Sequence, residues 1–97
     1  MTTIAVKNHI LEGLDYSSGT SLLVRIEAAF ATEERVLLDF SGADAITTAF
    51  LNGSIGEWIS KNDLALFKAK FQFVNLTPTM WEIIKNYVTK QFELEKA

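Results

Sequence analysis

The sequence predicts an α/β fold in a single domain spanning residues 1–97, with a mostly parallel or mixed four-stranded sheet and about three to four helices packed on it. Two observations support this prediction. Short apolar runs alternate with stretches whose apolar residues recur at helical spacing, an order that favours parallel strands joined by right-handed crossovers. Hydrophobic residues make up 48% of the chain, enough for one compact core, and 97 residues leave no room for a second.

The charge and the residue content exclude several classes of function. The net charge of −3 comes from 12 acidic and 9 basic residues, and the basic residues are scattered along the chain. We therefore expect no binding to nucleic acid, which depends on clustered positive charge. The chain has no cysteine, hence no disulfide framework and no thiolate nucleophile. Because it shows no signal-peptide pattern and no apolar run of membrane-spanning length, we expect a cytoplasmic protein without membrane contact.

The first part of the chain predicts a strand, an ambiguous segment and a helix. Residues 2–6 are rich in β-favouring types and predict a strand. Residues 7–16 fit either a second short strand or a loop that tucks its apolar residues under the sheet. Those apolar residues are Ile10, Leu11 and Leu14. Apolar residues from Leu22 to Phe30 then lie on one helical face, and Ser18 or Thr20 is the expected N-cap.

The middle of the chain predicts a strand, a loop, a pair of hydroxyl residues and a helix. Residues 36–40 form an apolar run expected of a strand buried on both faces, and Gly42 marks the turn after it. Thr47 and Thr48 stand where the helix begins, so that a side-chain hydroxyl can accept a bond from an unpaired backbone N–H. The apolar stripe of this helix should face the sheet. Its members are Leu51, Ile55, Trp58 and Ile59.

A second stripe of the same helix consists almost entirely of small residues. Its members, roughly opposite the apolar stripe, are Ala49, Gly53, Gly56 and Ser60. Each glycine inside a helix costs about 1 kcal/mol relative to alanine, so two of them need a reason. One reason is close packing against another part of the same chain. The other is a flat surface on which a partner docks, and we favour it because the apolar stripe already accounts for packing on the sheet.

The last part of the chain predicts a strand and a long helix. Residues 64–70 fit a short helical tail or a loop against the core, and residues 71–74 are apolar and aromatic, as expected of a strand. Thr77 is the expected N-cap of the next helix, and Pro78 fits its first turn, where a missing N–H costs nothing. Apolar residues at helical spacing continue to about Phe92.

The residue pattern gives little support to catalysis. His9 is the only histidine, no Gly-x-Ser-x-Gly elbow exists, and His9 is expected at the surface. Acidic residues near a strand end can bind Mg²⁺ or act as bases. We expect instead that Asp39 bonds loop amides and that Asp44 and Glu57 are solvated. The sequence thus predicts no catalytic residue, metal site or cofactor, and a protein that is not an enzyme.

The segment from Asp39 to Gly56 resembles the signature of STAS domains, the fold of anti-sigma factor antagonists. In that family a strand ending in Asp-Leu-Ser-Gly leads to Asp-Ser-Ser-Gly-Leu at a helix start. Aligned without gaps, Thr47 falls on the family's Asp and Thr48 on the Ser that a partner kinase phosphorylates. The segment is closer still to short STAS-like domains of uncharacterised function, which carry Asp-Phe-x-Gly, a hydroxyl pair, Phe and Leu. It departs from the STAS pattern at Thr47, at Ala49 in place of the second Ser, and at Phe50 in place of Gly.

This resemblance implies a bacterial, non-catalytic regulatory module that binds another protein through the loop and helix starting at Thr47. The implied partner is a histidine-kinase-like ATPase or an anti-sigma factor, and Thr48, or else Thr47, is the expected phosphorylation site. A phosphate there would add close to two negative charges at a helix N-terminus and would repel a docked partner. The expected partner-binding residues are Asp44, Ala49, Asn52, Gly53, Gly56, Glu57 and Ser60.

Two alternatives remain from the sequence. The first is a structural or assembly subunit that self-associates through its glycine-bearing face, for example as a homodimer. The second is a small nucleotide-binding or hydrolytic domain that uses Asp39, Asp44 and Thr48.

Overall fold

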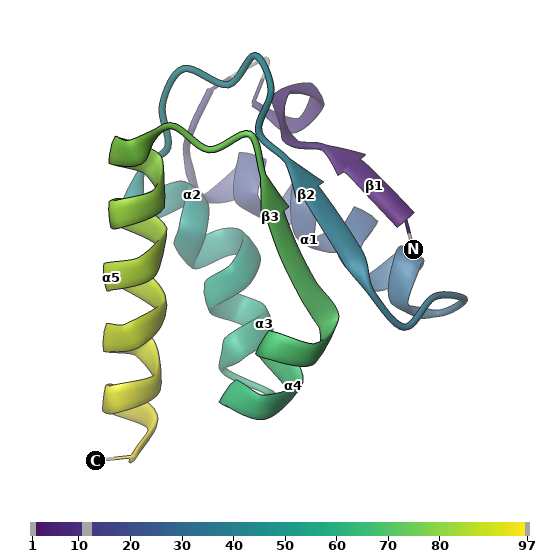
Figure 1. Ribbon diagram of the computed structural model, residues 1–97, viewed down its shortest axis with the longest axis vertical. Coiled ribbons are helices and arrows are strands. Elements are labelled where there is room, and N and C mark those ends of the chain that lie inside the picture. Colours follow the sequence, from purple (N-terminus) through teal and green to yellow (C-terminus); the bar gives the residue numbers. More distant parts are fainter. Residues whose placement is uncertain (1, 11–12, 97) are drawn as a thin grey trace.

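The sheet has three strands in the part of the chain that the structure describes, rather than the four expected. The computed structural model describes residues 2–10 and 13–96, with side chains as far as residue 93. Strands β1 (Thr2–Ala5), β2 (Val36–Asp39) and β3 (Phe71–Val74) are all parallel and lie side by side in that order (Figure 1).

The ambiguous segment does not add a strand in the residues described. The 3₁₀ turn η1 (Val6–His9) directly follows β1 and turns the chain away from the sheet. Ile10 and Leu14 are partly buried against the core, as the loop alternative predicted, and Leu11 lies outside the described residues.

Helices occupy the segments where helical spacing was found. These are α1 (Tyr16–Phe30), the run α2 (Thr48–Leu51), η2 (Asn52–Gly56) and α3 (Glu57–Ile59), then α4 (Leu64–Lys70) and α5 (Pro78–Lys96). The run α2–η2–α3 is continuous over residues 48–59 and is called the central helix below; its middle part, η2, is a π-helix. The last helix continues beyond the expected end at Phe92.

The caps of the helices agree with the sequence in one case and differ in another. The Thr77 hydroxyl accepts a hydrogen bond from the Met80 N–H at 3.2 Å, so Thr77 is the N-cap that was predicted. The first helix begins earlier than expected, because the Asp15 carboxylate accepts from the Ser18 N–H at 2.9 Å. Ser18 and Thr20 therefore lie inside α1, and their prediction as N-caps is wrong.

The two faces of the sheet differ in burial. The face that carries Val36 and Leu38 packs on helices, and neither side chain is accessible to solvent. The opposite face carries Leu37, which is half-buried, and Gln72, which is exposed. The expectation that the middle strand is buried on both faces is wrong, because the alternating side chains of β2 meet helices on only one face.

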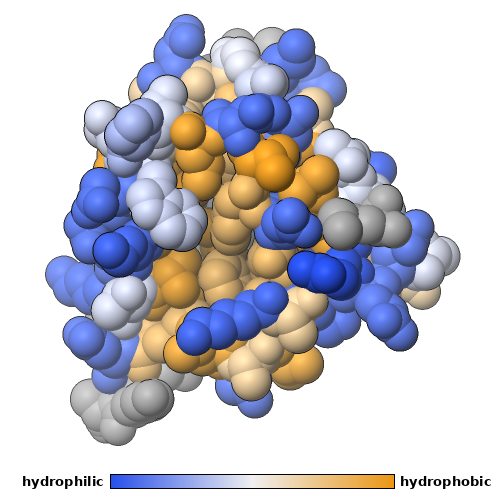
Figure 2. Space-filling view, in the orientation of Figure 1, coloured by the Kyte–Doolittle hydropathy of each residue, from blue (hydrophilic) through white to orange (hydrophobic). Residues whose placement is uncertain are grey.

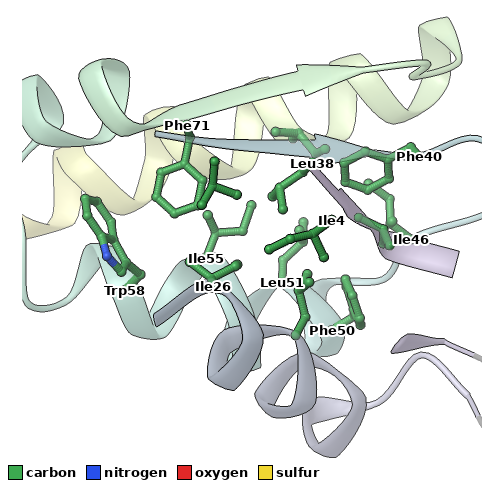
Figure 3. Packing of buried hydrophobic residues seen from close by; sticks show 14 of the residues in the cluster. Ile4, Ile26, Leu38, Phe40, Ile46, Phe50, Leu51, Ile55, Trp58 and Phe71 are labelled. Atoms are coloured by element: carbon green, nitrogen blue, oxygen red, sulfur yellow. The ribbon is translucent and has the colours of Figure 1, made fainter. Parts of the chain in front are cut away.

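The core lies between this face of the sheet and the central helix. The apolar stripe of the central helix faces the sheet as predicted, and Leu51, Ile55 and Ile59 are each 1% exposed. Figure 3 shows Leu51 and Ile55 pointing toward the sheet, from which Leu38 and Phe71 project. At one end the rings of Phe71 and Trp58 meet edge to face, with centroids 4.9 Å apart.

Candidate functional site

Asp39 ties together the loops that follow two neighbouring strands. Its Oδ1 accepts a hydrogen bond from the Ser41 N–H at 2.9 Å and from Asn75 Nδ2 at 2.8 Å. Asn75 directly follows β3 and has a φ of +60°, in the left-handed region that asparagine tolerates. The bond from Asn75, followed by that from the Ser41 N–H, lowers the pKa of Asp39. The prediction that Asp39 bonds loop amides is confirmed, and its carboxylate has a structural role.

The two threonines at the start of the central helix differ in the use of their hydroxyl groups. Thr47 Oγ1 accepts from the Phe50 N–H at 3.1 Å and donates to the Leu14 carbonyl oxygen. It thus caps the helix and anchors the loop before α1. Thr48 is exposed, and its hydroxyl makes no hydrogen bond to any other residue that the structure describes. Of the two candidates for phosphorylation, Thr48 is thus the one whose hydroxyl is not bonded to any residue in the described ranges 2–10 and 13–96.

Gly53 does not face solvent, which corrects the prediction that the small-residue stripe forms an open docking surface. It is buried where the central helix crosses α1, and a Cβ atom at Gly53 would overlap the Tyr16 carbonyl oxygen. A Cβ atom at Gly19 would in turn overlap the Phe50 carbonyl oxygen. The two helices can approach this closely only without side chains at the crossing. Close packing within the chain, the alternative that we did not favour, explains this glycine.

Tyr87 of α5 contacts both Gly56 and Asn52. The Tyr87 hydroxyl donates to Asn52 Oδ1 at 2.6 Å, and a Cβ atom at Gly56 would overlap this hydroxyl. Burial and then the charge of Glu57 raise the pKa of Tyr87. Gly56 is only half exposed. The prediction that it lies on an open face is therefore wrong, because α5 covers it as α1 covers Gly53.

Glu57 is also held within the chain rather than solvated. It is half-buried and accepts a hydrogen bond from the Tyr16 hydroxyl at 2.7 Å. This bond raises the pKa of Tyr16. The prediction of a solvated Glu57 is wrong, because α1 brings Tyr16 to it from 41 positions away in the sequence.

The predicted partner-binding residues that stay exposed are Asp44, Ala49, Asn52 and Ser60. Ser60 lies at the far end of the central helix, and its hydroxyl donates to the Glu57 carbonyl oxygen at 2.7 Å. The others lie at or before the helix start, where Ala49 and Asn52 are three positions apart and therefore adjacent on one face. We call Asp44, Thr48, Ala49 and Asn52 the helix-start surface.

A shallow hollow of about 630 Å³ borders this surface at Asp44. Its lining is formed by Lys7, Ile10, Gly13, Leu14, Gly42, Asp44 and Ala45. Lys7 lies against Gly42, since a Cβ atom there would be 3.1 Å from Lys7 Cδ. The hollow therefore places one cation and one anion beside the loop that leads to Thr48.

Two features of the site were missed by the sequence reasoning. The first is Gly19, which meets Gly53 at the helix crossing, whereas the expected N-caps Ser18 and Thr20 placed it at the very start of the helix. The second is the π-helical segment η2. Such segments are rare in proteins as a whole, and those that occur are often found at functional sites. Within it, Ser54 is fully buried and its hydroxyl donates to the Phe50 carbonyl oxygen at 2.9 Å. The only sequence signal for either feature was the occurrence of glycines in a helix.

In the described part of the chain, no group of three or more histidine, aspartate or glutamate side chains lies close enough together to hold a metal ion. His9 is half-buried, with Nδ1 3.2 Å from Ser21 Oγ. Burial, followed by the charge of Arg25, lowers the pKa of His9. Among the described helices, none combines the length and the hydropathy needed to cross a bilayer.

The fold and the site define a small α/β domain in which a strand is followed by a loop and then by an N-capped helix with an exposed first turn. The family model of the STAS-like domain of unknown function (DUF4325) matches residues 18–81, and the chain belongs to this family. The matched region contains Asp39, Thr47, Thr48 and both glycines of the helix crossing. No curated protein and no solved structure gives a significant match.

Proposed function

We propose that this STAS-like domain is a non-catalytic regulatory module that binds a partner protein through its helix-start surface, and that phosphorylation of Thr48 controls the binding. The observation that supports this most directly is the contrast between the two threonines. The Thr47 hydroxyl makes two hydrogen bonds within the fold, whereas Thr48, at the first position of α2, is exposed and its hydroxyl makes none to the residues that the structure describes. A kinase can therefore modify Thr48 without breaking the helix cap.

The proposed control is electrostatic. A phosphate on Thr48 would bring close to two negative charges to the helix N-terminus, where the macrodipole stabilises them. The charge would lie among residues that are otherwise neutral, with Asp44 as the one anion of the surface. A partner that docks against this surface would meet like charge or a changed shape, and the fold itself would be preserved.

The proposed partner class is a histidine-kinase-like ATPase or an anti-sigma factor, by analogy with the STAS domains that the segment from Asp39 to Gly56 resembles. Self-association through the glycines is disfavoured, because α1 covers Gly53 and Tyr87 covers Gly56. Nucleotide binding through Asp39 is disfavoured as well, since its carboxylate already accepts from Asn75 and from the Ser41 N–H.

Affinity capture from native cell extract tests the docking surface. The bait is the wild-type chain, compared with Asp44→Lys and Ala49→Arg, both at exposed positions of the helix-start surface. Lys90→Glu serves as the matched control, because Lys90 is exposed on α5, one helical turn beyond Tyr87, and does not belong to the helix-start surface. Circular dichroism first confirms that every variant is folded.

We expect one partner to be retained by wild type and Lys90→Glu and lost by both surface variants. Equal capture by all four proteins would contradict the proposed surface. A Gly53→Arg variant is unsuitable, because a side chain there would force α1 off the central helix.

A further inference from the structure

An apolar groove lies between α4, β3 and α5, and its lining includes no residue of the helix-start surface. Its volume is about 530 Å³. Its lining is formed by Leu64, Phe67, Lys68, Phe71, Phe73, Trp81, Ile84, Lys85, Val88, Thr89, Phe92 and Glu93. Figure 2 shows the hollow beside α5, with an apolar floor and hydrophilic residues along its borders.

The groove exists because α5 contacts the core along only one of its faces. Met80, Ile84 and Phe92 are buried and anchor the helix. On the neighbouring face Trp81 is 50% exposed and Val88 is only half-buried. A molecule that fills the groove removes this apolar surface from water and thereby gains binding energy.

The net charge of the groove lining is positive, whereas the net charge of the whole chain is negative. Lys68 of α4 and Lys85 of α5 both line it, with Glu93 as the one carboxylate of the lining. Neither lysine has an ion-pair partner in the part of the chain that the structure describes. The protein as a whole has a net charge of −3, yet the lining of the groove carries more cations than anions.

We propose that this groove binds a free small amphipathic carboxylate, such as a medium-chain fatty acid. The apolar body would lie on Phe67, Phe73 and Val88, and the carboxylate would meet Lys68 or Lys85. The volume lies within the roughly 300–1,000 Å³ typical of small-molecule sites. The length also suits a small molecule, because Trp81 and Phe92 are 11 positions apart on α5, or about 16 Å. Charge-assisted hydrogen bonds to a lysine supply the preference for an anionic head.

Titration of the full chain with decanoate, below its micelle concentration, tests the proposal. Trp81 reports on the groove because it is half exposed, whereas Trp58 is 6% exposed in the core. We expect a saturable blue shift of the tryptophan emission, with the affinity measured by calorimetry. Decylamine, which has the same tail and a cationic head, should bind at least about tenfold more weakly.

The double variant Lys68→Glu and Lys85→Glu should weaken decanoate binding at least about tenfold, because it reverses both cations of the groove. Lys90→Glu is the matched control and should bind decanoate as wild type does. Absence of saturable binding, equal affinity for decylamine, or binding that leaves the Trp81 emission unchanged would each overturn the proposal. A blue shift that grows with protein concentration alone would mean that a second copy covers the groove, which would also overturn it.

Discussion

Gly19 of α1 and Gly53 of the central helix meet at the point where the two helices cross. A Cβ atom on Gly19 would lie 3.0 Å from the Gly53 Cα atom and would overlap the Phe50 carbonyl oxygen. The contact therefore joins backbone to backbone and leaves no space for a methyl group on either helix. It fixes the position of the central helix, and with it the position of Thr48 at the helix start.

Gly53→Ala should lower the free energy of unfolding by about 1–3 kcal/mol, as overpacking of a core usually does. The obstacle is the Tyr16 carbonyl oxygen, which cannot move without moving α1. The expected loss is notable because alanine is otherwise about 1 kcal/mol more favourable than glycine in a helix. Urea unfolding followed by circular dichroism measures it. Stability equal to or above that of wild type would show that the helices are not in contact here.

Gly56→Ala should also destabilise, but a second substitution should relieve the defect. At this glycine the overlapping atom is the Tyr87 hydroxyl, at the end of a side chain. Tyr87→Phe removes that hydroxyl, and on its own it should cost about 0.5–1.5 kcal/mol through the lost bond to Asn52. The double variant should therefore be more stable than the sum of the two single changes predicts. Simple additivity in urea unfolding would contradict this arrangement.

Thr47→Ala should cost about 0.5–2 kcal/mol of stability, the usual effect of removing an N-cap. Its hydroxyl accepts from the Phe50 N–H and also donates to the Leu14 carbonyl oxygen, so both bonds are lost. Thr48→Ala should change stability by no more than about 0.5 kcal/mol, because Thr48 is exposed and its hydroxyl is bonded to no residue among those described. Chemical unfolding of the two variants side by side tests the distinction. A larger loss for Thr48→Ala would reverse the assignment.

Asp39 should make the stability of the protein depend on pH in the acid range. Its pKa is lowered in the folded state, chiefly by the bond from Asn75, so its stabilising contribution is present above the unfolded pKa of about 3.9. This contribution should be lost as the pH falls through the folded pKa. Asp39→Asn should therefore be less stable than wild type at neutral pH, with the difference shrinking in acid. A difference that does not change with pH would contradict the role of the Asp39 charge.

The features that the sequence predicted correctly are mostly local. The Thr77 cap, the apolar stripe from Leu51 to Ile59 and the bonding of Asp39 to a loop amide each depend on residues close together in the chain. The spacing of apolar residues and the residue types at the ends of elements are enough to predict such local features.

The features that the sequence did not predict, or predicted wrongly, depend on contacts between helices. The sequence shows that Gly53 lies opposite the apolar stripe, but not that α1 covers this side. Likewise, Glu57 is paired with Tyr16 and Asn52 with Tyr87 across 41 and 35 positions. The expected fourth strand, which the described residues do not contain, has a different cause, because residues 7–16 have the composition of either a strand or a buried loop.

The most direct test of the central claim is the affinity of the captured partner for Thr48→Glu and for Thr48→Val. Both changes remove the Thr48 hydroxyl, but only glutamate adds negative charge at the helix start. We predict that Thr48→Val binds the partner as wild type does and that Thr48→Glu binds it at least about tenfold more weakly. Equal binding by Thr48→Glu and wild type would contradict the claim that charge at Thr48 controls docking.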